Sequence, residues 1–366
     1  MGQVLGGDLA RGKEEKTKMN RRDFFTAVGL LPLLGYGGTR ASAAGCAGRC
    51  DRLLVLIELK GGSDGLNMAV PYTDPAYYRL RPSLAVERGQ VRQLSESTGL
   101  HPALSPLMPL WDAGELALVQ GVGYAQPNFS HFRSIDIWDT AAASDQYLHD
   151  GWLARAFEQF RAPALTPGGV AIGSTALGPL AGSGTRCVAL AGANELPLCT
   201  AFRERTSEQN MRTACAVIAG GSEVAALRIT LNGFDTHSNQ RHSETRLLQE
   251  LAQALASLKA ALIEINRWDS TLIMTYSEFG RQAKENPSAG TDHGSTNTHF
   301  VAGGAVKGGL YGEAPALNRL DGAGHLPFAI DFRRLYATLL ETWWGVASAP
   351  ILGERFAVLD LLKSPA

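Results

Sequence analysis

Four segments of the chain have the apolar pattern of buried β-strands. Residues 52–59, 116–120 and 271–276 are almost continuously apolar, which is typical of strands that are covered on both faces. In 225–231, leucine and isoleucine recur at every second position, a period that also indicates a strand. Each segment runs into a polar loop that contains glycine, so these loops carry the candidate chemistry.

Helical periodicity is clearest between Glu244 and Asn266, where leucine and isoleucine step by threes and fours along one face. Because strand 225–231 precedes this helix and strand 271–276 follows it, the three elements predict a right-handed crossover that joins two parallel neighbouring strands. Shorter helices are predicted at 100–113, 132–140 and 331–342.

The composition fits an α/β protein with parallel strands. Hydrophobic residues make up 45% of the 366 positions, which is ample for one large α/β domain or two small ones. The segment 161–215 contains glycine, proline, alanine and short apolar runs without a clear motif. We interpret it as a candidate cap or insertion.

The first 43 residues have the pattern of an export signal. Asn20 to Phe25 contains a twin-arginine pattern, an apolar run extends to Leu34, and Ala41-Ser42-Ala43 is a small-residue cleavage site. We therefore expect the twin-arginine export machinery to deliver the chain to the periplasm or otherwise out of the cytoplasm. The alternative is an amphipathic leader that is never cut. Met19 directly precedes the pattern, so the true start could lie there.

Charge and hydropathy exclude two classes of partner. The formal net charge is -1, whereas a nucleic-acid-binding protein would be expected to have a basic face. The apolar run of the leader is too short to span a bilayer, so we do not expect an integral membrane protein. The five cysteines are an odd number, and in an oxidising compartment Cys187 could pair with Cys199, or Cys46 with Cys50.

Acidic and imidazole side chains are concentrated in the loops that follow the four strands. The carboxyl ends of parallel strands meet at one edge of a sheet, where open α/β sheets bind ligands. We therefore expect these side chains to face one crevice. They are Asp64 after the first strand, Ser130 and His131 after the second, Asp235 and His237 after the third, and Asp292, His293 and His299 after the fourth.

The Asp292-His293 pair is the part of this set that favours a metal. It places an oxygen ligand beside an imidazole, and Gly294 allows the backbone to turn directly after them. The alternative is a turn-capping aspartate with solvated histidines. A mixture of carboxylates and imidazoles suits Zn or Mn better than Mg or Ca. We expect one or two divalent ions.

Ser130 and Arg281 are the candidate catalytic residues. Ser130 directly precedes a predicted helix, where free backbone N–H groups and the helix dipole favour an anion. The alternative is an ordinary N-cap serine. Arg281 follows the last strand, and its guanidinium matches the oxygens of a tetrahedral anion. The alternative for Arg281 is a surface ion pair.

Four blocks of the chain resemble the signature blocks of the domain-of-unknown-function 1501 family, whose members are exported proteins. The blocks are GGSDGLN, NFSHFRSIDIW, GFDTHSNQRH, and SEFGR with TDHG and HFVAGGAVKGG. That family is remotely similar to the alkaline phosphatase and sulfatase superfamily. The resemblance implies a mixed, largely parallel sheet flanked by helices on both faces, in a single alkaline-phosphatase-like domain over residues 44–366.

The superfamily resemblance also implies roles for site residues. Asp64, Asp292 and His293 would hold one metal, and Asp235, His237 and His299 a second. Only one residue separates Asp235 from His237, where the superfamily usually has three, so His242 is the other candidate for the second metal. Ser130 matches the nucleophile, which would attack in line and form a covalent intermediate.

The function that this resemblance implies is metal-dependent hydrolysis of phosphate or sulfate esters. An anionic ester, such as a sulfated or phosphorylated glycan, would be the substrate. The alternative is a non-catalytic periplasmic binding or accessory protein that keeps the fold. For an accessory protein, the aromatic segments 72–78 and 343–344 are candidate contacts with an exported partner.

Overall fold

The structure is a computed structural model that describes residues 52–159, 168–182, 186–190, 206–220 and 224–363. All of these residues lie in the compact unit Gly45–Ala366. The predicted export signal and three of the cysteines, Cys46, Cys50 and Cys199, lie outside the described residues.

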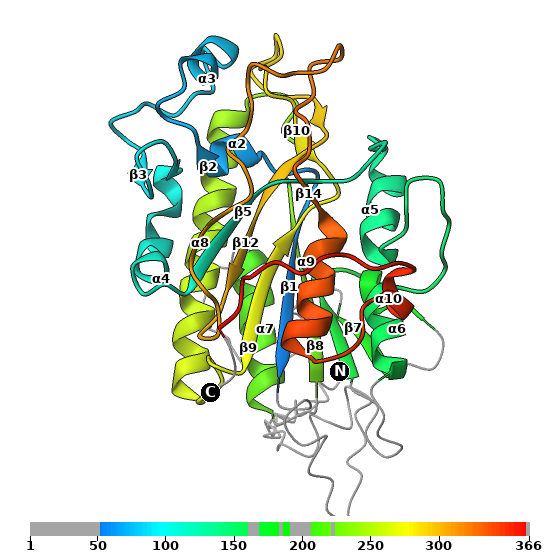
Figure 1. The fold of residues 1–366 in the computed structure, drawn as a ribbon. Helices are drawn as coiled ribbons and strands as arrows, with labels where there is room; N and C mark the ends of the chain where they lie inside the picture. Colours follow the sequence, from blue (N-terminus) through cyan, green and yellow to red (C-terminus); the bar gives the residue numbers. More distant parts are fainter. Residues whose placement is uncertain (1–51, 160–167, 183–185, 191–205, 221–223, 364–366) are drawn as a thin grey trace, which may run out of the picture. The chain divides into compact units, whose positions relative to one another are not determined.

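A mixed, largely parallel sheet forms the centre of the molecule (Figure 1). Its strands, in spatial order, are β13 (Gly309–Tyr311), β5 (Leu116–Gly123), β12 (Asn297–Ala302), β9 (Thr271–Tyr276), β1 (Leu53–Lys60), β8 (Val224–Asn232), β6 (Gly168–Ile172) and β7 (Cys187–Leu190). β14 (Ile330–Asp331) pairs with β5. Only β12 is antiparallel to its neighbours, β5 and β9, so the carboxyl ends of β1, β5, β8 and β9 share one edge.

Alternate side chains of β1 enter two separate hydrophobic cores. Leu54 and Leu56 belong to one core, and Val55 and Ile57 to the other. Successive side chains of a strand point to opposite faces, so a continuous apolar run requires cover on both. The predicted class, a mixed, largely parallel sheet with helices on both faces, is confirmed.

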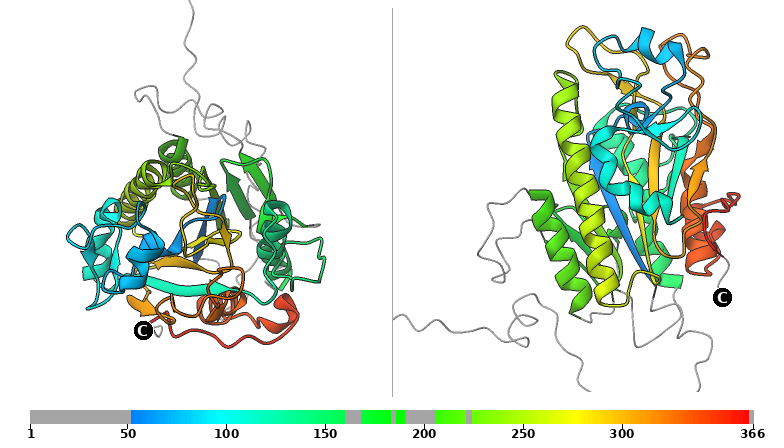
Figure 2. Two further views of the ribbon diagram at one scale, coloured as in Figure 1. Left: turned by 90° about the horizontal axis from the view of Figure 1, so that it is seen from above. Right: turned by 90° about the vertical axis from the view of Figure 1, so that its left-hand side faces the viewer.

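The helices divide between the two faces (Figure 2). One face is covered by α5 (His131–Thr140), α6 (Trp152–Gln159), α9 (Phe332–Thr338), the π-helical turn η4 (Leu339–Trp343) and α10 (Ala349–Leu352). The other face is covered by η1 (Pro102–Leu107), α4 (Met108–Asp112), α7 (Thr206–Ala219) and α8 (Gln240–Glu264).

Smaller elements lie around the edge that carries the loops. They are α2 (Gly65–Met68), α3 (Pro75–Leu80), the strands β2 (Ala69–Val70), β3 (Arg92–Gln93) and β4 (Gly99–Leu100), and the hairpin of β10 (Gly280–Arg281) with β11 (His293–Gly294). The turn η2 (Gly178–Leu180) packs instead on one face of the sheet, in the same core as α5 and α6.

The four predicted strands are present, but the predicted crossover is wrong in one respect. β8 and β9 flank α8 in the chain and are parallel, yet each pairs with β1, which lies between them. They are therefore second neighbours. The apolar pattern of β1 did not reveal this position, because any central strand of such a sheet is covered on both faces.

The described parts of the segment 161–215 extend the central sheet. β6 pairs with β8, and β7 pairs with β6, both in parallel. The first ten residues of α7 also belong to this segment. Cys187, at the start of β7, and Cys215 in α7 are free thiols, and the predicted partner Cys199 lies outside the described residues.

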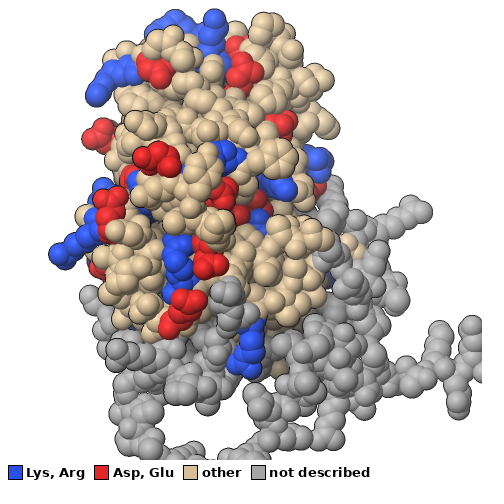
Figure 3. Space-filling view, turned by 90° about the vertical axis from the view of Figure 1, so that its right-hand side faces the viewer, with Lys and Arg blue, Asp and Glu red and all other residues tan. Residues whose placement is uncertain are grey.

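The described residues show neither a purely basic face in Figure 3 nor a membrane-spanning helix, as the composition led us to expect. On the face shown in Figure 3, Lys and Arg side chains are interspersed with Asp and Glu. None of the helices within the described ranges combines the length and the apolar character that crossing a bilayer requires.

Candidate metal centre

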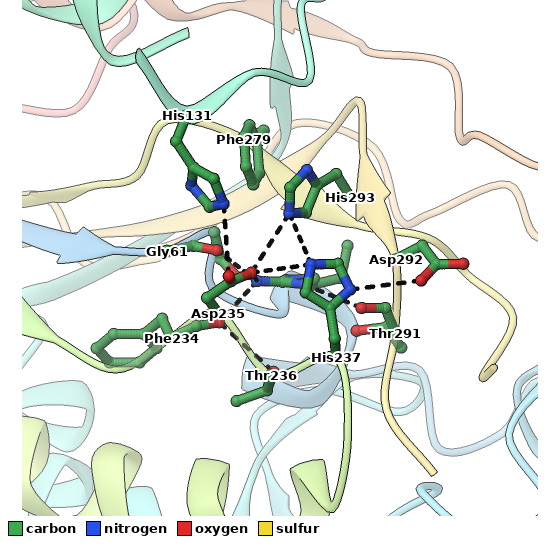
Figure 4. Close-up of polar contacts among 12 residues, drawn as sticks. Gly61, His131, Phe234, Asp235, Thr236, His237, Phe279, Thr291, Asp292 and His293 are labelled. Carbon is green, nitrogen blue, oxygen red and sulfur yellow. Dashed lines mark hydrogen bonds and ion pairs between the residues drawn. The ribbon is translucent and has the colours of Figure 1, made fainter. Parts of the chain in front are cut away.

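The loops after β1, β5, β8 and β9 meet at the carboxyl edge of the sheet (Figure 4). Gly61 shows how closely they pack. Its φ is +118°, and a Cβ atom built on it would lie 2.3 Å from the backbone nitrogen of Asp235. Only glycine tolerates both conditions, so the glycines after β1 let this loop pass directly against the loop after β8.

Two imidazoles converge on the carboxylate of Asp235. His131 Nε2 lies 3.5 Å from Asp235 Oδ2, and His293 Nε2 lies 3.3 Å from Asp235 Oδ1. These three residues present one ligand atom each within 4.8 Å of one another. The side chains come from α5, the loop after β8 and β11, and all point to one position (Figure 4).

His237 and Asp292 extend this cluster on its exposed side. His237 Nε2 lies 3.0 Å from Asp235 Oδ1 and 2.9 Å from His293 Nε2. Its other nitrogen, Nδ1, lies 3.4 Å from Asp292 Oδ1. By contrast His242, the other candidate, lies exposed on α8. The structure thus brings together four of the six predicted metal ligands, Asp235, His237, Asp292 and His293.

The rings of His131 and His293 are oriented by acceptors behind them. His131 Nδ1 lies 2.9 Å from Oε1 of the buried Glu278, and His293 Nδ1 lies 2.9 Å from the carbonyl oxygen of Phe129. Because these oxygens accept, each Nδ1 carries the proton and donates. In the neutral form of the ring, which is the form that binds metal, the Nε2 atom has a lone pair and faces Asp235.

The charge states of the cluster favour a cation. Burial lowers the pKa of His293, and the hydrogen bond to Phe129 offsets this only in part. For Asp235, partial burial acts to raise the pKa, but the hydrogen bond and charge of Arg281 outweigh it and lower the pKa. A neutral imidazole and an ionised carboxylate are the forms that bind metal.

The ligand spacing also fits an ion. A tetrahedral ion with bonds of about 2.0 to 2.1 Å holds its ligand atoms roughly 3.3 to 3.4 Å apart. His131 Nε2 and His293 Nε2 lie 3.5 and 3.3 Å from Asp235, each from a different oxygen of its carboxylate. One ligand atom from each of the three residues lies within 4.8 Å of the others. The donor set and its orientation therefore suit a divalent metal.

Arg281 was predicted to clamp an anion, and the structure gives it a different role. Its side chain is fully buried, and it donates five hydrogen bonds, to Asp235 Oδ1 at 2.8 Å and to the carbonyl oxygens of Gly61, Gly62, Phe234 and Thr291. A guanidinium enclosed by backbone acceptors cannot reach a substrate. Arg281 instead ties three loops together and holds Asp235 in place.

Asp64 also lies outside the cluster, although it follows β1 as predicted. One carboxylate oxygen pairs with the buried Arg81 at 2.5 Å and accepts from Gln240 at 2.5 Å, while the other caps α2 through the N–H of Leu66. Its lone pairs are thus directed to protein donors. The carboxylate links α2, Arg81 and α8, and it is not part of the His131, Asp235 and His293 cluster.

His299 is the second predicted ligand that the structure places elsewhere. It lies within β12, is fully buried, and packs edge-on against Trp138 with ring centroids 5.2 Å apart. Neither ring nitrogen has a hydrogen-bond partner in the described part of the chain, and burial lowers the pKa of His299 to about 3. The prediction treated this segment as loop, whereas its polar start continues into a strand.

Ser130 lies at the N-cap of α5, beside His131. The side chain is exposed and forms no capping hydrogen bond, while the backbone N–H donates to Asn128 Oδ1 at 2.9 Å. The ordinary capping role, which was the alternative interpretation, is therefore not filled. The hydroxyl is free to meet a ligand.

Two residues of the site were not assigned a role from the sequence. His131 was recognised only as a loop histidine beside Ser130, and Glu278 was part of the SEFG block without a function. One sequence feature could have assigned a role to His131. It lies at the start of a predicted helix, after a strand whose carboxyl end was expected at the same edge as the other loops. Glu278 had no signal, because its partner lies 147 positions away.

Comparison with known proteins agrees with the sequence blocks. Residues 195–353 match the family model described as "Protein of unknown function (DUF1501)". The predicted resemblance to that family is confirmed over this range, which contains the Asp235, Arg281 and Asp292-His293 blocks. No curated protein matches the chain in sequence.

Several solved structures are similar to the chain at low sequence identity. The C-terminal periplasmic domain of EptC from Escherichia coli, in complex with Zn, has 12% identity and a TM-score of 0.43, over 69% of this chain and 73% of that one. Lipoteichoic acid synthase LtaP from Listeria monocytogenes has 8% identity and a TM-score of 0.45, over 81% and 72%. A protein in the alkaline phosphatase superfamily from Vibrio parahaemolyticus has 11% identity and a TM-score of 0.46, over 83% and 69%.

Proposed function

We propose that the protein is an exported, metal-dependent hydrolase of phosphate or sulfate esters. The observation that carries this proposal is the convergence of His131 and His293 on the Asp235 carboxylate, with both Nδ1 protons engaged by acceptors behind the rings. His237 and Asp292 complete a donor set for one or two ions. The mixture of nitrogen and oxygen ligands suits Zn or Mn.

A divalent ion in this cluster would supply Lewis-acid polarisation of the ester and neutralise charge as it develops. The protein contributes the geometry. Arg281 and Glu278 fix Asp235 and His131 from behind, so the ligand groups need little rearrangement when an ion binds. This preorganisation supports a resident metal over an incidental one.

Ser130 is the residue that we assign to nucleophilic attack. It is exposed, it makes no capping bond, and it directly precedes His131, one of the candidate ligands. The free N–H groups in the first turn of α5 and the helix dipole favour an anionic group at the same place. An anionic ester, such as a sulfated or phosphorylated glycan, would meet both features.

The leader supports the proposed location. A twin-arginine pattern, an apolar run and a small-residue cleavage site occur in order within residues 1–43. This route carries folded proteins, so the metal could be bound before export. We therefore place the mature protein in the periplasm or outside the cell.

The test combines elemental analysis with a substrate screen. Purified mature protein should contain a stoichiometric divalent metal and should cleave generic aryl phosphates or aryl sulfates, with loss of both after chelation. A folded preparation that neither contains nor takes up metal would rule the proposal out. Bound metal without cleavage of any ester would favour the non-catalytic binding or accessory role.

A further inference from the structure

Phe279 lies against both imidazoles that converge on Asp235 (Figure 4). Its ring stacks on that of His293, with the centroids 4.1 Å apart and an angle of 29° between the ring planes. The same ring meets His131 at 5.0 Å and 51°. Because the rings of His131 and His293 are themselves 4.7 Å apart, each of the three rings contacts the other two. One apolar side chain thus takes part in placing two candidate ligands that come from separate parts of the chain.

The ring of Phe279 has little freedom to move. The residue is only 3% exposed, and a Cβ atom on Gly62 would lie 2.5 Å from two of its ring carbons. The backbone is held as well, because the carbonyl oxygen of Phe279 accepts from Asn297 Nδ2 at 3.1 Å. The carbonyl oxygen of the preceding residue, Glu278, accepts from Ser134 Oγ. Phe279 is therefore a fixed surface against which the imidazoles pack.

One hydrogen bond does not fix the orientation of an imidazole ring. The Nδ1 atom of His131 is bonded to Glu278, and that of His293 to a backbone carbonyl oxygen, yet a ring can still turn about such a bond. The side chain of His131 is also 38% exposed, so a large part of it has no packing around it. Contact with a rigid aromatic ring restricts this rotation. Groups behind the ligands that hold their orientation typically contribute about 10- to 100-fold to metal affinity.

The ring also limits how many ligands an ion can have at this centre. Phe279 offers no lone pair, and because it is buried against both imidazoles it keeps water from that side of the cluster. Zn is most often four-coordinate, whereas Mn is typically octahedral and so takes more oxygen ligands, water among them. An apolar wall beside two imidazoles therefore disfavours the ion that needs the larger shell.

We propose that Phe279 is a positioning residue, which holds the two imidazoles in a fixed mutual orientation and keeps water from one side of the ion. The consequence is selection of Zn over Mn, the two metals that the ligand set itself suits. This inference rests on the metal centre of the proposed function. It does not depend on ester cleavage, because it concerns only metal affinity and coordination.

Phe279→Leu and Phe279→Ala test this role, since both remove the ring and keep every candidate ligand. Cobalt(II) is the spectroscopic probe, because a four-coordinate cobalt site absorbs visible light strongly and a six-coordinate site weakly. We expect strong absorption from the unmodified mature protein and a several-fold weaker band from both variants. In chelator competition, Zn affinity should fall by about 10- to 100-fold and Mn affinity by less. Leucine keeps more apolar volume than alanine, so Phe279→Leu carries the test where Phe279→Ala does not fold.

Phe300→Leu is the matched control. Phe300 is equally buried, but it lies within β12 in the core on the face that α8 covers. This variant should lose stability as Phe279→Leu does, while its cobalt band and its Zn and Mn affinities should equal those of the unmodified protein. Equal changes in the two variants, or an unchanged cobalt band and an unchanged ratio of Zn to Mn affinity in Phe279→Leu, would overturn the inference.

The same measurements separate this inference from the proposed hydrolase. A weak, six-coordinate cobalt spectrum from the unmodified protein would overturn the role of Phe279 and leave a metal-dependent hydrolase standing. A Zn-selective centre that depends on Phe279 but cleaves no ester would support the inference and refute the hydrolase. An unmodified protein that takes up no metal would overturn both.

Discussion

Arg281 donates a 2.8 Å hydrogen bond to Asp235 from a fully buried guanidinium, while the carboxylate that accepts it is 45% exposed. The same guanidinium binds carbonyl oxygens in the loops after β1, β8 and β9. Three loops from distant parts of the chain thus share one cation. Asp235 is held at the surface by a group that solvent does not reach, which is why its orientation does not depend on a bound ion.

Arg281→Lys is expected to damage both stability and metal binding. Lysine keeps the charge but lacks the planar set of donors, so at least two buried carbonyl groups lose their partner. The free energy of unfolding should fall by about 3 kcal/mol or more, and metal affinity by about 10- to 100-fold. Denaturant unfolding and chelator competition measure the two effects. Arg246→Lys, at an exposed ion pair, is the matched control, and equal losses in both variants would contradict this role.

Asp235→Asn should remove metal from the purified protein. The amide keeps the shape of the side chain but no longer offers a negative oxygen to a cation. A metal that binds only the folded state stabilises it by about 2.7 kcal/mol when its free concentration is 100 times the Kd. We therefore expect added Zn or Mn to raise the Tm of the unmodified protein and to leave that of the variant unchanged.

The control for this substitution is Asp360→Asn, which alters an exposed carboxylate near the C-terminal end of the chain. Its metal content and its metal-dependent Tm should equal those of the unmodified protein. If Asp235→Asn retains metal at the same stoichiometry as Asp360→Asn, the candidate centre is not where the ion binds.

The sequence predicted the sheet better than the order of its strands. The apolar run at 53–60 and the leucine stripe of α8 depend on local periodicity, which the chain displays directly. The position of β1 between β8 and β9 depends on pairing between residues more than 160 positions apart. Periodicity shows that a strand is buried and does not show which strands lie beside it.

The site was predicted in part for the same reason. Asp64 and Asp235 both follow buried strands and glycines, so the sequence treats them alike. Their roles differ because Arg81, Gln240 and the N–H of Leu66 together occupy both oxygens of Asp64. Arg281 binds only Oδ1 of Asp235, and this carboxylate also meets the histidines. His131 was expected to face the crevice but was given no ligand role, because the acceptor that orients it, Glu278, is far away in the chain.

Ser130→Ala tests the nucleophile independently of the metal. The hydroxyl makes no capping hydrogen bond, so its removal should leave Tm and metal content unchanged. Ester cleavage should fall by about three orders of magnitude or more if Ser130 attacks the substrate. Ser238→Ala removes another exposed serine near the same edge and should keep full activity. Turnover by the Ser130 variant at the unmodified rate would exclude it as nucleophile.

His299→Leu should reduce the loss of stability in acid. The folded-state pKa of His299 is about 3, below the ordinary value of 6.5. Between these two pH values the unfolded chain therefore binds a proton at His299, whereas the buried ring of the folded protein stays neutral. This contribution to stability is complete above pH 6.5 and falls by about 1.4 kcal/mol per pH unit as the pH drops toward 3. Denaturant unfolding between pH 7 and 5, with a chelator present, should show a shallower slope for His299→Leu than for His242→Leu, which changes an exposed histidine. Identical slopes in the two variants would show that His299 accepts a proton in the folded protein.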